Sequence, residues 1–305
     1  MAVTRMRFTG SGNGTHYIDL AKAMSLQERK LHRQKKIYTV YGGFFVDTPA
    51  TGQVSRANIN TAPNTWVTRN AVNRGFRIWK RMIAETVKSV DGLKTGKYSD
   101  FKVYLNNNHG AGPLLPVDAA GNNLYLAGPE WDYSTLTSAD PGELADGTTA
   151  PADQFELNIV GHRNPGPVVP DGTNNAGWTR VGLVESWLNT RPTPHTNLPT
   201  DTPDGPADPL ANLFDAGDVD DDRILVIESE GDQAPYDEAA VFGMVSSNNT
   251  SDHNLQRQSV VTTTEQMPTG PVHGFQALCG LVQVEVTANG TWELVLDVET
   301  VGEAF

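Results

Sequence analysis

This sequence contains a single cysteine, no long apolar run and no lysine after Lys102. The single cysteine, Cys279, excludes an intrachain disulfide and a cysteine-rich zinc site, and its apolar neighbours predict a buried core residue. No run approaches the roughly 20 apolar residues that a membrane-spanning helix needs, and the first residues lack the apolar stretch of a signal peptide. We therefore expect no transmembrane segment and no secretion.

Sequence motifs of enzymes are missing as well. The seven histidines are scattered, with no His-Glu-x-x-His or His-x-His pair, and the chain has no Gly-x-Ser-x-Gly elbow and no phosphate-binding loop motif. We therefore expect a protein that is not an enzyme and needs no cofactor. A hydrolase whose catalytic residues lie far apart in the sequence stays open as an alternative, because a catalytic triad is defined by geometry.

The charges divide the sequence into two parts. All nine lysines lie at or before Lys102; residues 1–104 contain 18 Lys and Arg and 6 Asp and Glu, whereas residues 105–305 contain 5 and 30. A protein surface usually mixes its signs, so this division indicates one part that contacts a polyanion and another that faces water or cations.

Two clusters of basic residues are the candidate contacts for that polyanion. One is the run 29–36, which ends a loosely helical stretch from Tyr17, and the other is the polar face of a helix expected at 65–90, where apolar residues recur every three or four positions. The candidate nucleic-acid contacts are Arg29, Lys30, Arg33, Lys35, Lys36, Arg69, Arg74, Arg77, Lys80 and Arg81. A solvated helix face is the alternative interpretation of both clusters.

An acidic cluster is the candidate metal site. Asp218, Asp220 and Asp222 occupy the first, third and fifth positions of an EF-hand pattern, but Arg223 stands where a glycine is required and Ser229 where a bidentate glutamate belongs. The cluster is therefore not an EF-hand. Two interpretations stay open, a looser site for a structural divalent cation such as calcium, shared between subunits, and a solvated acidic loop.

Short strand candidates separated by long loops predict a mainly β protein. The last two candidates, 281–287 and 292–298, flank Asn289-Gly290, which predicts a hairpin, and Val282, Val284 and Val286 alternate with polar residues that we expect to face water or a partner. Segment 182–188 fits either a strand or a helical turn. Further strands are expected at 37–41 and 44–46, separated by a bend or bulge at Gly42-Gly43, and at 98–105, 124–126, 131–136, 155–160, 224–227 and 258–264.

These patterns predict an antiparallel β-sandwich of the jelly-roll type, with one or two inserted helices and long loops. A double jelly roll is the alternative. We expect residues 1–36 to form an N-terminal arm that carries the basic segment and whose first 18 residues are mobile or become ordered only on assembly. Residues 37–305 are expected to form the jelly-roll domain with the helix near 65–90 and the long acidic loops.

Four short segments give roughly the C-terminal 125 residues a family resemblance. They are VGLVESW at 181–187, LFDAG at 213–217, APYDE at 234–238 and GFQALCGLV at 274–282, followed by the expected closing hairpin. In this order they resemble jelly-roll capsid proteins of small single-stranded DNA viruses. One difference is that many such proteins begin with a long basic arm, whereas the first 28 residues here contain only Arg5, Arg7 and Lys22 as basic residues.

The resemblance implies a viral major capsid protein. Such a subunit is structural and non-catalytic, and it assembles into an icosahedral shell around the viral genome, here single-stranded DNA. Its partners are copies of itself and, in some shells, other capsid proteins. It is found in the virion that forms inside the host cell. Two other functions stay open. One is a carbohydrate-binding β-sandwich that uses Trp131, Tyr133, Trp178 and Trp187 as stacking platforms, and the other is the hydrolase considered above.

Overall fold

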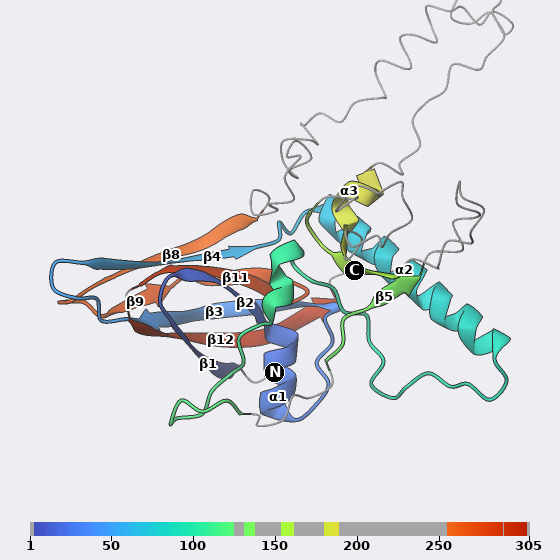
Figure 1. Cartoon of the computed structure of the whole chain (residues 1–305), viewed down its shortest axis with the longest axis horizontal. Helices are drawn as coiled ribbons and strands as arrows, with labels where there is room; N and C mark the ends of the chain where they lie inside the picture. Colours follow the sequence, from blue (N-terminus) through green and yellow to red (C-terminus); the bar gives the residue numbers. More distant parts are fainter. Residues whose placement is uncertain are drawn as a thin grey trace, which may run out of the picture.

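Two antiparallel β-sheets packed face to face form the body of the protein in a computed structural model (Figure 1). The structure describes residues 3–124, 131–137, 154–161, 180–188, 255–288 and 290–303. The first sheet has the strand order β1-β12-β3-β10, with β9 also paired to β3, and the second has the order β2-β11-β4-β8. The expectation of a mainly β, antiparallel sandwich is therefore confirmed.

Strands β3, β8, β11 and β12 lie at expected positions, whereas β1, β2, β4, β9 and β10 were not expected, and of the strand expected at 131–136 only the end, from Thr135, is a strand. Those of the first sheet are β1 (Thr4–Ser11), β3 (Lys36–Val46), β9 (Thr269–Val272), β10 (Phe275–Leu278) and β12 (Thr291–Glu303). Those of the second sheet are β2 (Gly14–Asp19), β4 (Val54–Thr61), β8 (Gln256–Thr264) and β11 (Leu281–Thr287). The bulge expected at Gly42-Gly43 is also present, because the register of β3 against β12 shifts next to Gly42.

Side chains from the facing sides of both sheets form the main core. Along β11, Val282, Val284 and Val286 are buried, as their alternation predicts. Gln283, expected to face water or a partner, is buried too. Its side-chain oxygen Oε1 accepts a hydrogen bond from Asn60 Nδ2 at 2.9 Å, and its side-chain nitrogen Nε2 donates to the Tyr17 hydroxyl at 3.3 Å. Both polar atoms of the side chain are therefore paired within the protein.

The expected closing hairpin is not a hairpin. The predicted strands are both present as β11 and β12, but they belong to different sheets: β11 pairs with β2 and β4, whereas β12 pairs with β1 and β3. The turn signal predicts that the chain reverses direction, and the alternation of apolar residues predicts one buried face. Neither pattern specifies which strand lies alongside, so the error lies in the pairing.

The prediction of a mobile N-terminal arm is also wrong for most of the arm's length. All eight residues of β1 pair with β12, and β2 pairs with β11, so the start of the chain contributes one strand to each sheet. Met6 and Phe8 alternate into the main core. Helix α1 (Leu20–Glu28) follows directly, with the Asp19 carboxylate accepting a hydrogen bond from the Lys22 amide as its N-cap.

A long insertion separates β4 from β8. Its described elements are α2 (Trp66–Ser89), the 3-10 helix η1 (Asn107–Ala111), β5 (Thr135–Thr137), β6 (Gln154–Asn158), β7 (Arg180–Gly182) and α3 (Leu183–Leu188). The three strands form a small sheet in the order β5-β6-β7. A second core lies where this insertion meets the sandwich: Phe101, Leu157 and Val184 from the insertion cluster with Ile37 and Leu281 from the sheets.

Helix α2 matches the helix expected at 65–90. The Thr65 hydroxyl caps its N-terminus, and its buried residues, which include Val67, Ala71 and Val72, lie in the first half. Figure 1 shows the second half extending away from the sandwich. In the part of the chain that the structure describes, no helix is both long enough and apolar enough to cross a membrane.

Segment 98–105 is not the strand we expected, although most of it is buried. Side chains accept three of its backbone amides: the Lys102 amide donates to Ser134 Oγ, the Val103 amide to Gln34 Oε1 and the Leu105 amide to His109 Nδ1. Its pairing with β6 is short, with the Tyr104 amide donating to the Leu157 carbonyl at 2.8 Å. Only Tyr104 forms a bridge, to Asn158. Segment 182–188 is the end of β7 followed by α3, and most of 124–126 and all of 224–227 lie outside the described residues.

Candidate nucleic-acid interface

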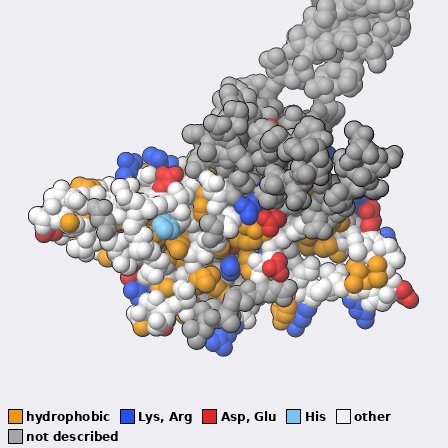
Figure 2. All heavy atoms as spheres, viewed as in Figure 1, with side chains coloured by type: hydrophobic (Ala, Val, Ile, Leu, Met, Phe, Trp, Pro, Cys, Tyr) orange, Lys and Arg blue, Asp and Glu red, His pale blue; other side chains and the backbone are white. Residues whose placement is uncertain are grey.

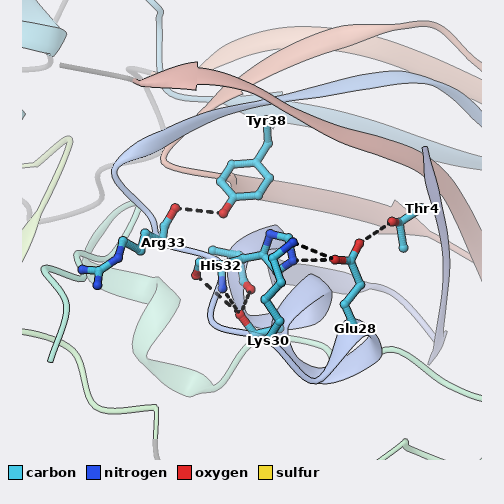
Figure 3. Close-up of polar contacts among 8 residues, drawn as sticks. Thr4, Glu28, Lys30, His32, Arg33 and Tyr38 are labelled. Carbon is cyan, nitrogen blue, oxygen red and sulfur yellow. Dashed lines mark hydrogen bonds and ion pairs between the residues drawn. The ribbon is translucent and has the colours of Figure 1, made fainter. Parts of the chain in front are cut away.

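The basic run 29–36 forms the loop between α1 and β3. The helix ends where Arg29 adopts a left-handed conformation (φ 53°), so the run is not helical. Figure 3 shows Glu28 at the centre of the contacts that hold this loop: its carboxylate accepts hydrogen bonds from Thr4 Oγ1 at 2.7 Å and His32 Nε2 at 2.8 Å, and Lys30 Nζ lies 3.6 Å away. The Tyr38 hydroxyl donates to the Arg33 carbonyl at 2.9 Å. The loop is therefore folded onto the sandwich.

The run does not present its five candidate cations on one patch. Arg29 and Lys30 are exposed. Arg33 is exposed too, but its Nη1 lies 3.2 Å from Asp100 Oδ1 in the insertion. Lys35 is half-buried, with its Nζ 5.2 Å from the centre of the Phe76 ring on α2. Lys36 is half-buried as well and begins β3, opposite Glu303. Arg33 and Lys35 thus join the sandwich to the insertion.

The Arg33–Asp100 pair lies at that junction. The Asp100 side chain is only 4% exposed, and burial raises the pKa of this carboxyl group, while the nearby charges of Arg33 and Lys102 oppose the rise. A buried carboxylate needs such partners, since an unpaired buried charge is costly. The structure therefore gives Arg33 a structural contact in addition to the role that the sequence predicts.

The candidate residues on α2 lie mainly on its solvent side. Arg74, Arg77 and Lys80 are exposed, and so is Arg81, whose Nε lies 2.7 Å from the Glu85 carboxylate. Arg69 is half-buried and donates to Asn64 Oδ1 at 2.7 Å. On the face shown in Figure 2, Lys and Arg side chains stand in several separate groups, with Asp and Glu side chains between some of them. The ten predicted contacts therefore do not form one continuous basic surface.

A groove on the sandwich adds basic residues that sequence reasoning missed. It has a volume of about 960 Å³, and its lining includes Arg5 and Arg7 from β1 and Lys102 from the insertion, together with Arg29 and Lys30. We call it the basic groove. Two arginines on one face of β1 were a possible signal, because residues two apart in a strand share a face, but the N-terminal segment was not recognised as a strand.

A buried polar network fastens the insertion to α1 and β2. The Asp19 carboxylate accepts hydrogen bonds from Gln34 Nε2 at 2.8 Å, Trp131 Nε1 at 2.9 Å and the Tyr133 hydroxyl at 3.2 Å, besides the Lys22 amide. Burial raises the pKa of Asp19, and these hydrogen bonds oppose the rise. The network links residues far apart in the chain, so we assign it a structural role.

His109 is a histidine whose surroundings can be compared with those of a catalytic base, which the hydrolase alternative requires. It is fully buried, and burial lowers its pKa to about 3. Its Nδ1 accepts the Leu105 amide at 3.0 Å, and its ring stacks on Tyr17 with 5.0 Å between the ring centres. A catalytic base needs access to a substrate, and this ring is enclosed by protein. Its contacts favour a role in packing.

The aromatic platforms of the carbohydrate alternative are occupied by neighbouring side chains. Lys102 Nζ lies 4.6 Å from the centre of the Trp131 ring, Tyr133 stacks on Tyr104 at 3.8 Å, and Trp187 packs edge-on against Trp66. Trp178 lies outside the described residues. No specific observation on these rings favours a sugar-binding surface.

The candidate metal residues Asp218, Asp220 and Asp222 lie outside the described residues. Within the described ranges, no group of three or more His, Cys, Asp or Glu side chains is placed to hold a metal ion. The expected divalent cation therefore stays a prediction from the sequence.

Fold and surface together define an antiparallel β-sandwich that carries a mixed α/β insertion and two separate basic surfaces. Comparisons of the chain with protein-family models, curated proteins and solved structures found no match.

Proposed function

We propose that this chain is a viral major capsid protein of the single jelly-roll type. It is a structural, non-catalytic subunit that assembles into a closed icosahedral shell and encloses the viral genome, a single-stranded DNA, in a virion formed inside the host cell. Its partners are other copies of itself and the packaged nucleic acid, with further capsid proteins as an additional class.

The strand order is the observation that carries this proposal. Strands β9 and β10 both pair with β3, so they count as one interrupted strand and the two large sheets contain eight. In chain order the first pairs with the eighth, the second with the seventh, the third with the sixth and the fourth with the fifth, as in one long hairpin. Two further pairings, eighth with third and seventh with fourth, roll this hairpin into two sheets. A jelly roll is such an eight-stranded double sheet.

The position of the insertion supports a single jelly roll over a double one. The eight strands complete one roll, and the remaining described strands form a separate three-stranded sheet between the fourth and fifth strands of the roll. Jelly rolls occur in lectins and cupins as well as in capsids, so the fold alone does not specify a function.

Charge is what favours a shell around nucleic acid. The basic residues concentrate in the first third of the sequence, and many of them lie on α2 or line the basic groove. A basic inner surface neutralises phosphates and releases their counterions, whereas acidic residues elsewhere keep the outside of a shell soluble. Closed shells require repeated contacts between identical subunits, which the roll and its insertion provide surface for.

Electron microscopy of the purified full chain at several salt concentrations tests this proposal. We expect closed particles that protect nucleic acid from nuclease. Monomers alone under every condition, without protected nucleic acid, would overturn it. The same preparations also test the alternatives, since a monomer that binds sugar or turns over a hydrolysable substrate would point to a different class of protein.

A further inference from the structure

We propose that the basic groove binds a short single-stranded segment of nucleic acid, with phosphates at Arg5, Arg29 and Lys30 and one unpaired base stacked on Tyr98. This inference deepens the proposed function and rests on it for the identity of the polyanion. It differs from the sequence-based expectation because it adds residues of β1 and of segment 98–102, and because it leaves out Arg33 and Lys35.

Three distant parts of the chain build the groove. Strand β1 contributes Arg5 and Arg7, the end of α1 contributes Arg29 and Lys30 next to Leu26, and the insertion contributes Tyr98, Lys102 and Trp131. Its volume of about 960 Å³ is at the upper end of the range for small-molecule sites. It is therefore large enough for a short segment of a chain ligand.

The cations at the rim of the groove are available to a ligand. The Arg5 side chain is 67% exposed although it pairs with Asp297, and the Lys30 side chain is 68% exposed with its Nζ 3.6 Å from Glu28. Arg29 is exposed and makes no ion pair with another described residue. The exposed Lys30–Glu28 pair is weak, so a phosphate can compete for Lys30. Arg5 donates to both Asp297 oxygens, at 2.7 and 2.8 Å, so a phosphate would contact it beside Asp297 rather than in its place.

One acidic side chain, Asp118, lines the groove, and its negative charge disfavours a phosphate directly beside it. The Asp118 carboxylate accepts hydrogen bonds from the backbone amides of Ala120 and Asn122, both at 2.9 Å, and this bonding lowers its pKa. Its oxygen atoms thus serve the turn of their own loop. Arg7 is a structural member of the lining, since its guanidinium donates to the carbonyls of Asp118 and Ala119 and to the Glu293 carboxylate.

Tyr98 is the residue that favours single-stranded over double-stranded nucleic acid as the ligand of the groove. Its side chain is 66% exposed, which is unusual for a large aromatic residue, and it borders a second groove of about 500 Å³ as well as the basic groove. Lys97 Nζ lies over one face of the ring, 5.4 Å from its centre, so a base would stack on the other face with this cation nearby. An unpaired base can stack on such a ring, whereas the bases of a duplex already stack on one another.

Binding of labelled oligonucleotides to the purified full chain tests the inference. The probes are a fluorescein-labelled oligo(dT), a duplex of equal length, and heparin as a non-nucleic polyanion, with fluorescence anisotropy measured over a range of salt concentrations. We expect Tyr98→Ala to weaken oligo(dT) binding about 5- to 150-fold and to leave duplex binding unchanged. The double variant R29Q/K30Q should reduce the salt slope of log K for oligo(dT) by about 1.4.

Arg257→Gln is the matched control, since Arg257 is an exposed cation on β8 that lies neither in the groove lining nor on α2. Its effect on oligo(dT) binding should be small. Wild-type affinity of Tyr98→Ala for oligo(dT) would overturn the inference. Equal losses for oligo(dT), duplex and heparin would overturn it as well, because the groove would then be a general polyanion site.

The two proposals fail separately. If the wild-type chain never forms particles but the groove variants lose oligo(dT) binding as expected, the groove inference is supported and the shell proposal is contradicted. If particles form and protect nucleic acid while the groove variants bind oligo(dT) like the wild type, the shell proposal is supported and the groove inference is contradicted.

Discussion

Gly280 is a residue where both backbone conformation and space require glycine. It follows Cys279 in the tight connection from β10 to β11, with a φ of +72°, and an added Cβ would lie 2.9 Å from Tyr38 Cδ2 and 3.2 Å from the Ala21 amide nitrogen. We expect Gly280→Ala to lower the free energy of unfolding by about 2 to 4 kcal/mol, since left-handed strain and crowding add together. Urea denaturation measures this change.

Gly52→Ala separates the two causes. Gly52 has a similar φ of +77°, but an added Cβ would meet no described atom within 4 Å. This variant should lose only the conformational part, about 1 to 2 kcal/mol. Equal losses at both positions would show that the contact with Tyr38 and Ala21 contributes nothing.

The loop between α1 and β3 should depend on pH for part of its stability. Hydrogen bonds from Thr4 and His32 lower the pKa of Glu28 in the folded protein. The unfolded chain then binds more protons in this range, so the contribution of Glu28 is present above the ordinary glutamate pKa of about 4.3 and is lost as pH falls through the lower folded value. We expect the melting temperature of Glu28→Gln to fall less than that of the wild type between about pH 5 and pH 3.

Glu85→Gln is the control for this titration. Glu85 pairs with Arg81 across one exposed turn of α2, and exposed pairs contribute about 0 to 1 kcal/mol. Its melting curve should follow the wild type at each pH. Parallel pH profiles for Glu28→Gln and the wild type would contradict the proposed role of Glu28 in holding the loop.

Elements whose pattern is local were predictable from the sequence, and their partners were not. Helix α2 was found because its apolar residues repeat with the period of a helix, and β11 because its valines alternate. Segment 98–105 has the composition of a strand, yet its backbone bonds to side chains such as Gln34 and His109, which no local pattern reveals. Strand β1 was missed because its partner β12 lies at the other end of the chain.

The same distinction applies to the candidate interface. Sequence spacing identified four exposed cations on α2, Arg74, Arg77, Lys80 and Arg81, because a helix places side chains by a fixed period. It did not separate Arg29 and Lys30 from Arg33 and Lys35 in the basic run. The direction of each of those side chains depends on Asp100 and Phe76, which belong to the distant insertion.

At the scale of the whole molecule, the roll brings the two ends of the chain together while the insertion carries the second basic surface. Every residue of β1 pairs with β12, so the sandwich closes only after the last strand is made. Such long-range pairing predicts slow folding. The basic surface on α2 projects from this closed body, and it is a separate candidate for genome contact.

Replacing Arg77 and Lys80 together with glutamine tests the surface of α2 in the assembled particle. Both side chains are exposed, so the variant should fold and assemble like the wild type but protect less nucleic acid from nuclease, with the larger deficit at higher salt. Arg33→Gln is the matched comparison, because it removes one cation that instead pairs with the buried Asp100. It should lose about 1 to 3 kcal/mol of stability and keep its packaged nucleic acid. The reverse pattern would place the genome at the basic run and not on α2.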